Sequence, residues 1–269
     1  MLSASLTYQG SSIQYYCWQG GPEQLIFFHG YGENALSFES LAAQLQHCYT
    51  TIAINLPWHG ETDWKGGLEF EIRDLIAIID LIPGIQQRYS LAGYSMGGRV
   101  ALQLYEHLYS RINKLILIAP DGLKVNGWYW LATQSRTGNR LFHHFMKKPG
   151  FFFAVTGVLQ KLGLINKGVF NFTRKFLLQE KSRLDLYRIW TTMRKFKPAI
   201  PLVSRLLKQE GTRVILIYGQ FDKIIRTKTG RRFAARVGKN ISLHVLPTGH
   251  KLLQGNNAEK IAALIEADA

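Results

Sequence analysis

Cysteine is scarce in this chain, and long hydrophobic runs are missing from it. Only Cys17 and Cys48 occur among 269 residues, too few for a disulfide framework and typical of a reducing compartment. No apolar run reaches the ~18 residues that a membrane-spanning helix needs. The amino-terminal stretch MLSASLTYQG has neither the basic nor the apolar region of a signal peptide. These absences predict a soluble, cytoplasmic protein.

Acidic residues are few in one long segment. Residues 121–212 hold 17 Lys and Arg against four Asp and Glu, so they carry +13 of the formal net charge of +15. This asymmetry indicates either an anionic partner or a basic, solvated helical surface. The partners that fit are a small-molecule substrate, anionic or lipid-like, and peripheral contact of this segment with an anionic membrane.

Several kinds of binding motif are also missing. No nucleic-acid-reading motif accompanies the basic charge. Neither a metal-ligand spacing nor a Gly-rich phosphate loop occurs. We therefore expect no nucleic-acid partner, no metal and no cofactor, and the sequence leaves the oligomeric state open.

The chain does contain short apolar runs that alternate with amphipathic segments of helical period. The runs are rich in β-branched or aliphatic residues, as buried strands are, and cover residues 12–18, 24–30, 50–57, 89–93, 114–120, 213–219 and 241–247. The first is expected to pair with the preceding SLTYQ in a hairpin. Helical patterns cover residues 37–46, 68–82, 98–109, 226–237 and 256–267. This alternation predicts an α/β fold with a doubly wound, mostly parallel sheet and functional residues at the carboxyl ends of its strands.

The alternation stops between residues 121 and 212. This segment is helix-like and basic, and it is rich in aromatic residues: Trp128, Tyr129, Trp130 and the run 151–153. It predicts a helical lid inserted into a core domain made of residues 1–120 and 213–269. The aromatic side chains fit either an apolar acyl pocket or the packing of the lid helices.

A serine stands at the junction of one predicted strand and the helix that follows it. Residues 93–97 read Gly93-Tyr94-Ser95-Met96-Gly97, which matches the G-x-S-x-G nucleophile elbow. Small neighbours permit a strained turn that exposes the hydroxyl at the edge of the sheet. An ordinary Gly-rich turn would read similarly, but the strand-then-helix context is the one that the elbow requires.

Two later strand ends supply chemical partners for this serine. A serine hydroxyl becomes a nucleophile when a base takes its proton and an acid orients that base. Asp222 follows the run 213–219, and His250 follows the run 241–247. The order Ser, acid, His is that of hydrolases with this elbow. The sequence therefore predicts a triad of Ser95, Asp222 and His250.

These motifs together resemble the α/β-hydrolase-fold superfamily over nearly the whole chain. The matching stretches are His29-Gly30-Tyr31-Gly32, Leu56-Pro57-Trp58-His59-Gly60, the elbow around Ser95, GQFDKII and PTGHKLL. The resemblance implies an eight-stranded, mostly parallel sheet flanked by helices, with residues 121–212 as a helical cap. It also implies that Ser95 is the nucleophile, Asp222 the acid and His250 the base. The oxyanion hole is then formed by the backbone N–H groups of Tyr31 and Met96.

Some positions depart from the family pattern or leave a choice. The second motif usually has Asp and Gly where this chain has Asn55 and Trp58, and Trp58 is expected to narrow or line the entrance. His29 and His59 are expected to brace loops rather than to act as bases. Asp121 is a second candidate acid, since some members carry the acid after that strand.

The motifs predict acyl-transfer chemistry and leave the substrate open. The leading hypothesis is a carboxylesterase-like serine hydrolase with an apolar or partly anionic acyl substrate. The alternative is a lyase, because GYSMGGR also resembles the elbow of the menaquinone-pathway synthase that eliminates pyruvate with the same triad. A non-catalytic protein of this fold is a third hypothesis, although no triad member is missing. The candidate substrate-binding residues are Tyr94, Arg99, Trp58 and Trp128.

Overall fold

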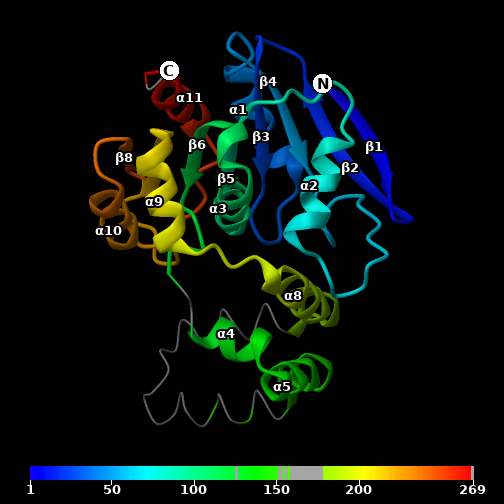
Figure 1. Ribbon diagram of the computed structural model, residues 1–269. Helices are drawn as coiled ribbons and strands as arrows, with labels where there is room; N and C mark the ends of the chain where they lie inside the picture. Colours follow the sequence, from blue (N-terminus) through cyan, green and yellow to red (C-terminus); the bar gives the residue numbers. More distant parts are fainter. Residues whose placement is uncertain (125–126, 151–153, 155–156, 158–177, 268–269) are drawn as a thin grey trace. The chain divides into compact units, whose positions relative to one another are not determined.

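The computed structural model describes residues 1–124, 127–150, 154, 157 and 178–267, and Figure 1 follows the chain through them. The chain divides into two compact units. Unit 1 holds Met1–Gly66, Phe70–Lys124 and Lys195–Ala269, and unit 2 holds Gly67–Glu69 and Val125–Arg194. Residues 195–212, which the sequence assigned to the cap, therefore belong to unit 1. Among the described residues, no helix is both long enough and apolar enough to cross a membrane.

Unit 1 is built on an eight-stranded sheet, as the sequence and the resemblance predict. The strands are β1 (Leu2–Tyr8), β2 (Ser11–Trp18), β3 (Glu23–Phe28), β4 (Tyr49–Ile54), β5 (Tyr89–Tyr94), β6 (Ile112–Ile118), β7 (Arg213–Gly219) and β8 (Ile241–Leu246). Their order in the sheet is β1-β2-β4-β3-β5-β6-β7-β8. The first two strands pair antiparallel, and the pairs from β4 to β8 are parallel. β2 is antiparallel to both of its neighbours, β1 and β4, and the carboxyl ends of β3 to β8 lie along one edge of the sheet.

The opening hairpin is confirmed. Tyr8 pairs with Ser11 across a two-residue turn, and both turn residues have positive φ, 48° at Gln9 and 75° at Gly10. That combination is typical of the two-residue turns whose twist matches that of the flanking strands.

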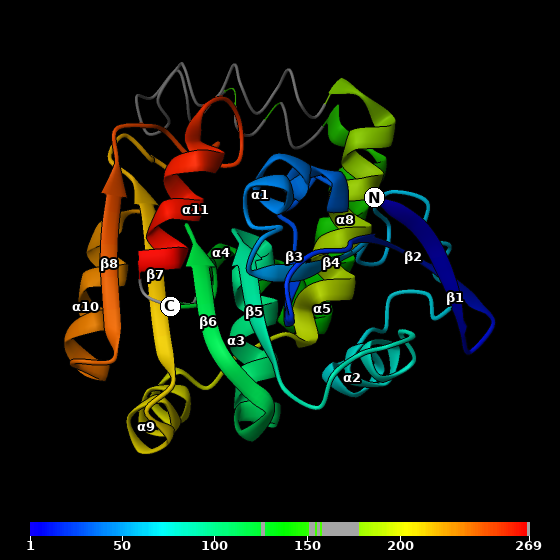
Figure 2. The ribbon, with the colours of Figure 1, turned by 90° about the horizontal axis from the view of Figure 1, so that it is seen from above.

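Helices cover both faces of this sheet (Figure 2). One face carries η1 (Ala35–Phe38), α1 (Glu39–Gln44) and α11 (Asn257–Ala267), and the other carries α2 (Ile72–Asp80), α3 (Met96–Leu108), α9 (Ile200–Glu210) and α10 (Thr227–Val237). Two short 3-10 helices lie in connections: η2 (Tyr109–Arg111) joins α3 to β6, and η3 (Met193–Lys195) lies where the chain passes from unit 2 to unit 1. In the core under α1 and α11, the stacked rings of Phe27 and Phe38 have centroids 4.4 Å apart.

The start of α2 differs from the prediction. The periodicity favoured a helix over residues 68–82, whereas α2 begins at Ile72. The Glu71 N–H donates to the Asp74 carboxylate over 2.8 Å, which stabilises a helix end at this point. Leu68 and Glu69 lie in unit 2 instead, where Arg194 binds both of them. Tertiary contacts thus overrode the local pattern.

Unit 2 contains α4 (Gly127–Gln134), α5 (Arg136–Lys147) and α8 (Glu180–Thr192), which pack on one another. Aromatic side chains join them: the Tyr129 and Trp190 rings meet edge to face with centroids 5.2 Å apart, and Phe142 lies 5.8 Å from Trp190. These aromatic residues pack the helices of unit 2 on each other, one of the two readings that the sequence left open. Residues 151–153 and the side chain of Trp128 lie outside the described part.

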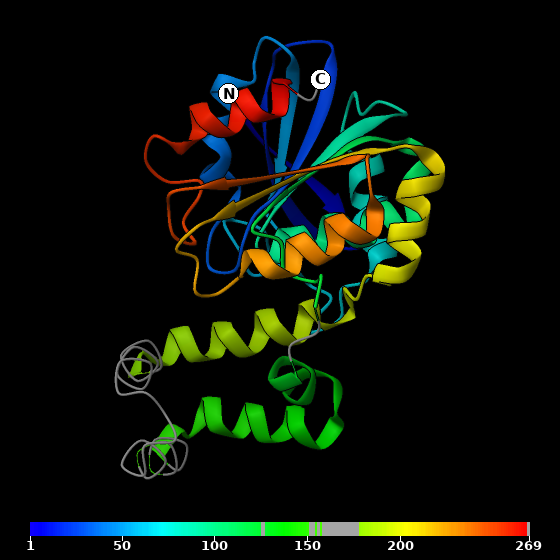
Figure 3. The same ribbon diagram turned by 90° about the vertical axis from the view of Figure 1, so that its left-hand side faces the viewer.

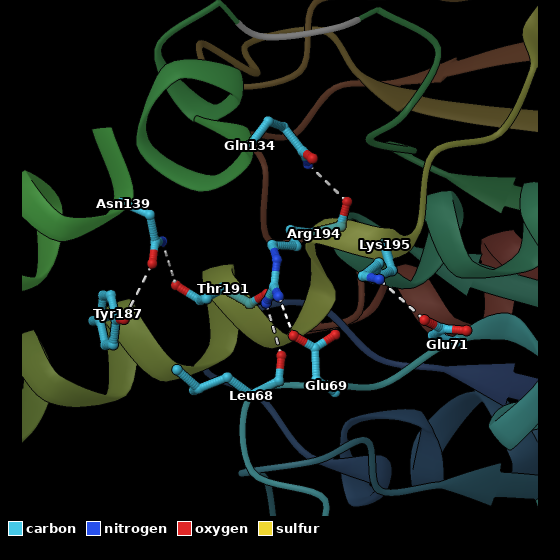
Figure 4. Close-up of polar contacts among 9 residues, drawn as sticks. All are labelled: Leu68, Glu69, Glu71, Gln134, Asn139, Tyr187, Thr191, Arg194 and Lys195. Atoms are coloured by element: carbon cyan, nitrogen blue, oxygen red, sulfur yellow. Dashed lines mark hydrogen bonds and ion pairs between the residues drawn. The ribbon is translucent and has the colours of Figure 1, made fainter. Parts of the chain in front are cut away.

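Two arginine side chains of unit 2 donate hydrogen bonds to backbone carbonyls. Buried Arg183 donates from Nε to the carbonyl of Met146 over 2.8 Å and from Nη1 to that of Leu178 over 2.9 Å. Arg194 donates to the carbonyls of Leu68 and Thr191 over 2.8 and 2.6 Å and pairs with Glu69. Figure 4 shows the Arg194 contacts and, next to them, the side-chain hydrogen bonds from Tyr187 to Asn139 and from Asn139 to Thr191. Arg183 and Arg194 thus each donate to a carbonyl in the last turn of a helix, that of Met146 in α5 and that of Thr191 in α8.

Candidate active site

The elbow is a strained turn between β5 and α3. Ser95 has φ 51° and ψ −114°, a backbone region that non-glycine residues rarely occupy. The Ser95 N–H donates to the carbonyl of Ile118 over 3.0 Å, and the Ser95 carbonyl accepts from Gly98 and Asp121 over 2.9 and 2.8 Å. These hydrogen bonds to the end of β6 and to α3 hold the serine in its strained conformation.

Small residues are required around this turn because backbone segments approach closely. A Cβ at Gly97 would collide with the carbonyl oxygen of Phe28 in β3, and one at Gly93 would collide with the carbonyl of Gly97. The two glycines of the G-x-S-x-G motif are therefore required because a Cβ would collide with the neighbouring backbone, and not because of their φ angles.

The structure brings Ser95, His250 and Asp222 together, although they come from three different strand ends. His250 Nε2 lies 3.1 Å from Ser95 Oγ, and His250 Nδ1 lies 2.7 Å from Asp222 Oδ2. An ionised carboxylate only accepts hydrogen bonds, so Nδ1 carries the proton and Nε2 is left to accept from the serine hydroxyl. This is the geometry that a base needs in order to activate a serine.

Asp222 is oriented by its own loop. Its Oδ1 accepts from the N–H groups of Ile224 and Ile225 over 2.8 and 2.9 Å, and its side chain is fully buried. These two hydrogen bonds hold Oδ1, which leaves Oδ2 for His250. The loop after β7 therefore presents its acid inward, toward the histidine.

Tyr94 braces the histidine loop. Its hydroxyl donates to the carbonyl of His250 over 2.8 Å, and the two rings have centroids 5.5 Å apart. Burial raises the pKa of the Tyr94 hydroxyl, so this group stays a donor. The structure thus shows Tyr94, a candidate substrate-binding residue, with its hydroxyl engaged by the backbone of His250.

Two buried histidines hold the loops on the other side of the elbow. His29 Nδ1 lies 2.9 Å from the carbonyl of Gly30, and its Nε2 accepts from the Leu56 N–H over 3.1 Å. His59 is arranged alike, with Nδ1 2.9 Å from the Pro57 carbonyl and Nε2 3.4 Å from the Gly32 nitrogen. Burial is the main cause that lowers the pKa of His29 well below its usual value, and His59 adds to it. Both side chains brace loops, as expected.

The loop after β3 lies against the nucleophile. A Cβ at Gly30 would stand 3.3 Å from Ser95 Cβ and 3.2 Å from the Tyr94 ring. Tyr31 follows Gly30 directly, and Met96 follows Ser95 as the first residue of α3. Tyr31 and Met96, the residues predicted for the oxyanion hole, therefore each directly follow a residue at the contact between the loop after β3 and the elbow.

Arg99 in α3 and Asp121 after β6 form an ion pair. Arg99 is buried, and its Nη2 lies 3.4 Å from Asp121 Oδ2. The other oxygen of Asp121 accepts from the Gly122 N–H over 2.7 Å. The carboxylate at His250 is accordingly that of Asp222, and Asp121 is engaged by Arg99.

The two candidate tryptophans are placed differently. Trp58 lies half-buried in the loop after β4, next to His59, and has φ 69°. This positive φ at the position where the family usually has Gly explains the family preference. Trp128 belongs to α4 of unit 2, and its side chain lies outside the described part.

One residue near the site was not singled out from the sequence. Glu33 lies in the loop after β3, and burial raises the pKa of its carboxyl while charge on His250 and Lys251 acts in the opposite direction. Its position directly after the HGYG stretch is the only signal that the sequence offered. Among the described residues, no group of three or more His, Cys, Asp or Glu side chains could hold a metal ion.

Comparison with known proteins agrees with the fold. A model of the alpha/beta hydrolase family matches residues 25–264, and the chain belongs to this family. It is 24% identical over 261 residues to the uncharacterized hydrolase YugF of Bacillus subtilis, an alignment that covers 91% of this chain and 89% of that protein.

One further relative matches over a shorter stretch, and a solved structure matches over nearly the whole chain. The chain is 30% identical over 120 residues to a pimeloyl-[acyl-carrier protein] methyl ester esterase of Aeromonas salmonicida, covering 44% of this chain and 46% of that protein. A thermophilic esterase from Thermogutta terrifontis shares the fold with a TM-score of 0.70 at 17% identity, over 99% of this chain and 97% of that one. The protein is thus an α/β hydrolase with relatives named as esterases.

Proposed function

We propose that this protein is a serine hydrolase that cleaves carboxylic esters. The observation that carries the proposal is the alignment of Ser95 Oγ, His250 and Asp222 Oδ2 through hydrogen bonds of 3.1 and 2.7 Å. A general base and its orienting acid are then already in place for the hydroxyl.

The proposed reaction proceeds in two halves. Ser95 Oγ attacks the ester carbonyl carbon as its proton passes to His250 Nε2, and Asp222 stabilises the resulting imidazolium. The N–H groups of Tyr31 and Met96 bind the oxyanion, each donor contributing about 3 kcal/mol to the transition state. The intermediate collapses, the alcohol leaves with the proton from His250, and an acyl-enzyme remains. Water, deprotonated by His250, then releases the acid and restores Ser95.

The proposed substrate is an ester with an apolar or partly anionic acyl group. Support comes from the similarity to a protein whose name specifies the methyl ester of a pimeloyl group. The lyase alternative receives no comparable support, because its elbow arginine would have to bind substrate carboxylates. In this chain Arg99 is buried and within ion-pair distance of Asp121.

A fluorophosphonate probe followed by mass spectrometry of the adduct tests the proposal. We expect the label on Ser95, its loss in Ser95→Ala, and a strong decrease in His250→Ala. Turnover of a panel of p-nitrophenyl and methyl esters should fall in Ser95→Ala by at least about a thousandfold. Full turnover in that variant would overturn the assignment, and an unlabelled wild-type protein would favour a non-catalytic role.

A further inference from the structure

The loop after β7 and the helix that follows it form a basic, partly apolar surface at one end of unit 1. We name it the α10 surface. It consists of the exposed residues Phe221, Lys223, Ile224, Arg226, Lys228, Arg231, Arg232 and Arg236. In Figures 2 and 3 α10 runs along the outer flank of the sheet beside β8, the last strand in the sheet order.

The cations of α10 all lie on one side of the helix. Lys228, Arg231, Arg232 and Arg236 are spaced i, i+3, i+4 and i+8, which places them along one face. The buried residues of the helix, Gly230, Phe233 and Val237, occupy the opposite face against unit 1. The fold therefore turns the whole charged face outward.

The sequence around α10 has no acidic residue to neutralise this face. From residue 223 to residue 258 the sequence has eight Lys and Arg and no Asp or Glu. Within the described ranges the six cations of the α10 surface form no ion pair. The first turn of α10 also lacks an acidic residue, although the helix dipole favours one there. Such a concentration of unpaired positive charge attracts an anionic partner.

Two apolar side chains adjoin these cations. Phe221 is 62% exposed and Ile224 is 71% exposed. They flank Asp222, whose carboxylate is turned inward to His250. One short loop thus orients the acid of the site and presents a hydrophobic pair to solvent.

The shape and chemistry of the surface decide which anionic partner fits. The eleven residues of α10 extend over about 16 Å, so the charges cannot converge on one small anion. Exposed Phe and Ile beside Lys and Arg are typical of helices and loops that bind a lipid interface: the apolar groups enter the acyl boundary, and the cations meet anionic headgroups. We propose that the α10 surface docks unit 1 on an anionic lipid bilayer. This goes beyond the proposed function and locates membrane contact outside the segment 121–212 that the net charge favoured.

Vesicle binding by the full-length protein tests this proposal. The vesicles contain equal parts of phosphatidylcholine and phosphatidylglycerol, with pure phosphatidylcholine as the neutral reference. We expect partition to the anionic vesicles that weakens with added salt. Lys228→Glu should lower it about tenfold or more. The matched control is Lys260→Glu on α11, an exposed lysine on the opposite face of the sheet, which should change partition less than twofold.

Further variants separate the lipid surface from other polyanions. Phe221→Ser with Ile224→Ser should weaken binding to anionic vesicles and leave any binding to duplex DNA unchanged. Absence of vesicle binding, equal effects of Lys228→Glu and Lys260→Glu, or DNA binding as tight as vesicle binding would each overturn the proposal. The Ser95→Ala variant should bind vesicles like the wild type, so failure of the proposed hydrolase activity and failure of docking are distinguishable. Hydrolysis of a soluble ester by Lys228→Glu should stay at the wild-type rate.

Discussion

Charged side chains are used differently in unit 2 and in the α10 surface of unit 1. In unit 2, Arg183 and Arg194 are directed at backbone carbonyls and at Glu69. On α10, Lys228, Arg231 and Arg232 face solvent with no ion pair among the described residues. Both regions are basic in sequence, but Arg183 and Arg194 are engaged within unit 2, whereas the α10 cations are exposed. Net charge counted along a sequence therefore does not locate the charge that is available for binding.

In the candidate active site a charged side chain has a third role, and substituting it should have the largest effect on activity. Asp222 is buried and serves to orient His250. Asp222→Asn should lower kcat on a p-nitrophenyl ester about 10⁴-fold, because the amide favours the wrong histidine tautomer. The melting temperature should change little, since the amide retains the shape of the carboxylate. A fall in activity of less than tenfold would show that Asp222 is not the acid.

Removing a structural arginine from unit 2 should affect stability rather than chemistry. Arg183→Met removes the donor of the buried Met146 carbonyl, at a cost of about 1–3 kcal/mol, and that of the Leu178 carbonyl in an exposed residue, at a smaller cost. Hydrogen exchange should become faster in α5 and α8. The matched control Arg231→Met should change stability by less than about 0.5 kcal/mol. Equal effects of both variants would contradict the contrast between the two regions.

Protonation of a buried histidine in unit 1 should give a smaller, pH-dependent effect. Burial lowers the pKa of His29 in the folded state, so below about pH 6.5 the unfolded chain binds a proton that the folded chain does not. The free energy of unfolding should therefore fall as pH decreases from 7 to 5, by at most about 1.4 kcal/mol per pH unit from this residue.

Denaturant titrations of wild type and His29→Gln over this pH range measure that contribution. The slope should be smaller in His29→Gln, and His107→Gln serves as the exposed comparison. Identical slopes in wild type and His29→Gln would show that His29 does not contribute.

The smallest expected effect is a gain of stability on α10. Lys228→Glu places a carboxylate in the first turn of the helix, where the dipole favours negative charge, by about 0.3–1 kcal/mol. Thermal unfolding should show a slightly raised melting temperature. A clearly lowered melting temperature would mean that Lys228 makes a structural contact. Arg232→Glu would then replace Lys228→Glu as the test variant in the vesicle experiment.

Much of unit 1 could be predicted because its signals are local. Apolar runs ending at Gly or Pro marked the strands, and the turn residues Gln9 and Gly10 marked the hairpin. The elbow was recognised from five adjacent residues, since its strain and close contacts demand small side chains at fixed spacing. His250 and Asp222 could be located because each follows a strand.

Other features depended on partners far away in the chain. The pattern at 68–82 indicated one helix, but Arg194, more than a hundred residues later, binds Leu68 and Glu69. Tyr94 was predicted as a candidate substrate-binding residue, and the structure adds that its hydroxyl donates to the carbonyl of His250. The predicted segment 121–212 ends beyond unit 2, because α9 packs with α3 and α10 in unit 1.

The sequence by itself determined the α/β class and pointed to Ser95, His250 and two candidate acids, because periodicity and turn chemistry act between near neighbours. Only the tertiary structure decided which carboxylate meets His250, which arginines are engaged inside unit 2 and which cations remain on the surface. Those outcomes depend on the spatial positions of groups that are remote in sequence, because a hydrogen bond depends on distance and angle and a Coulomb interaction on distance and surroundings.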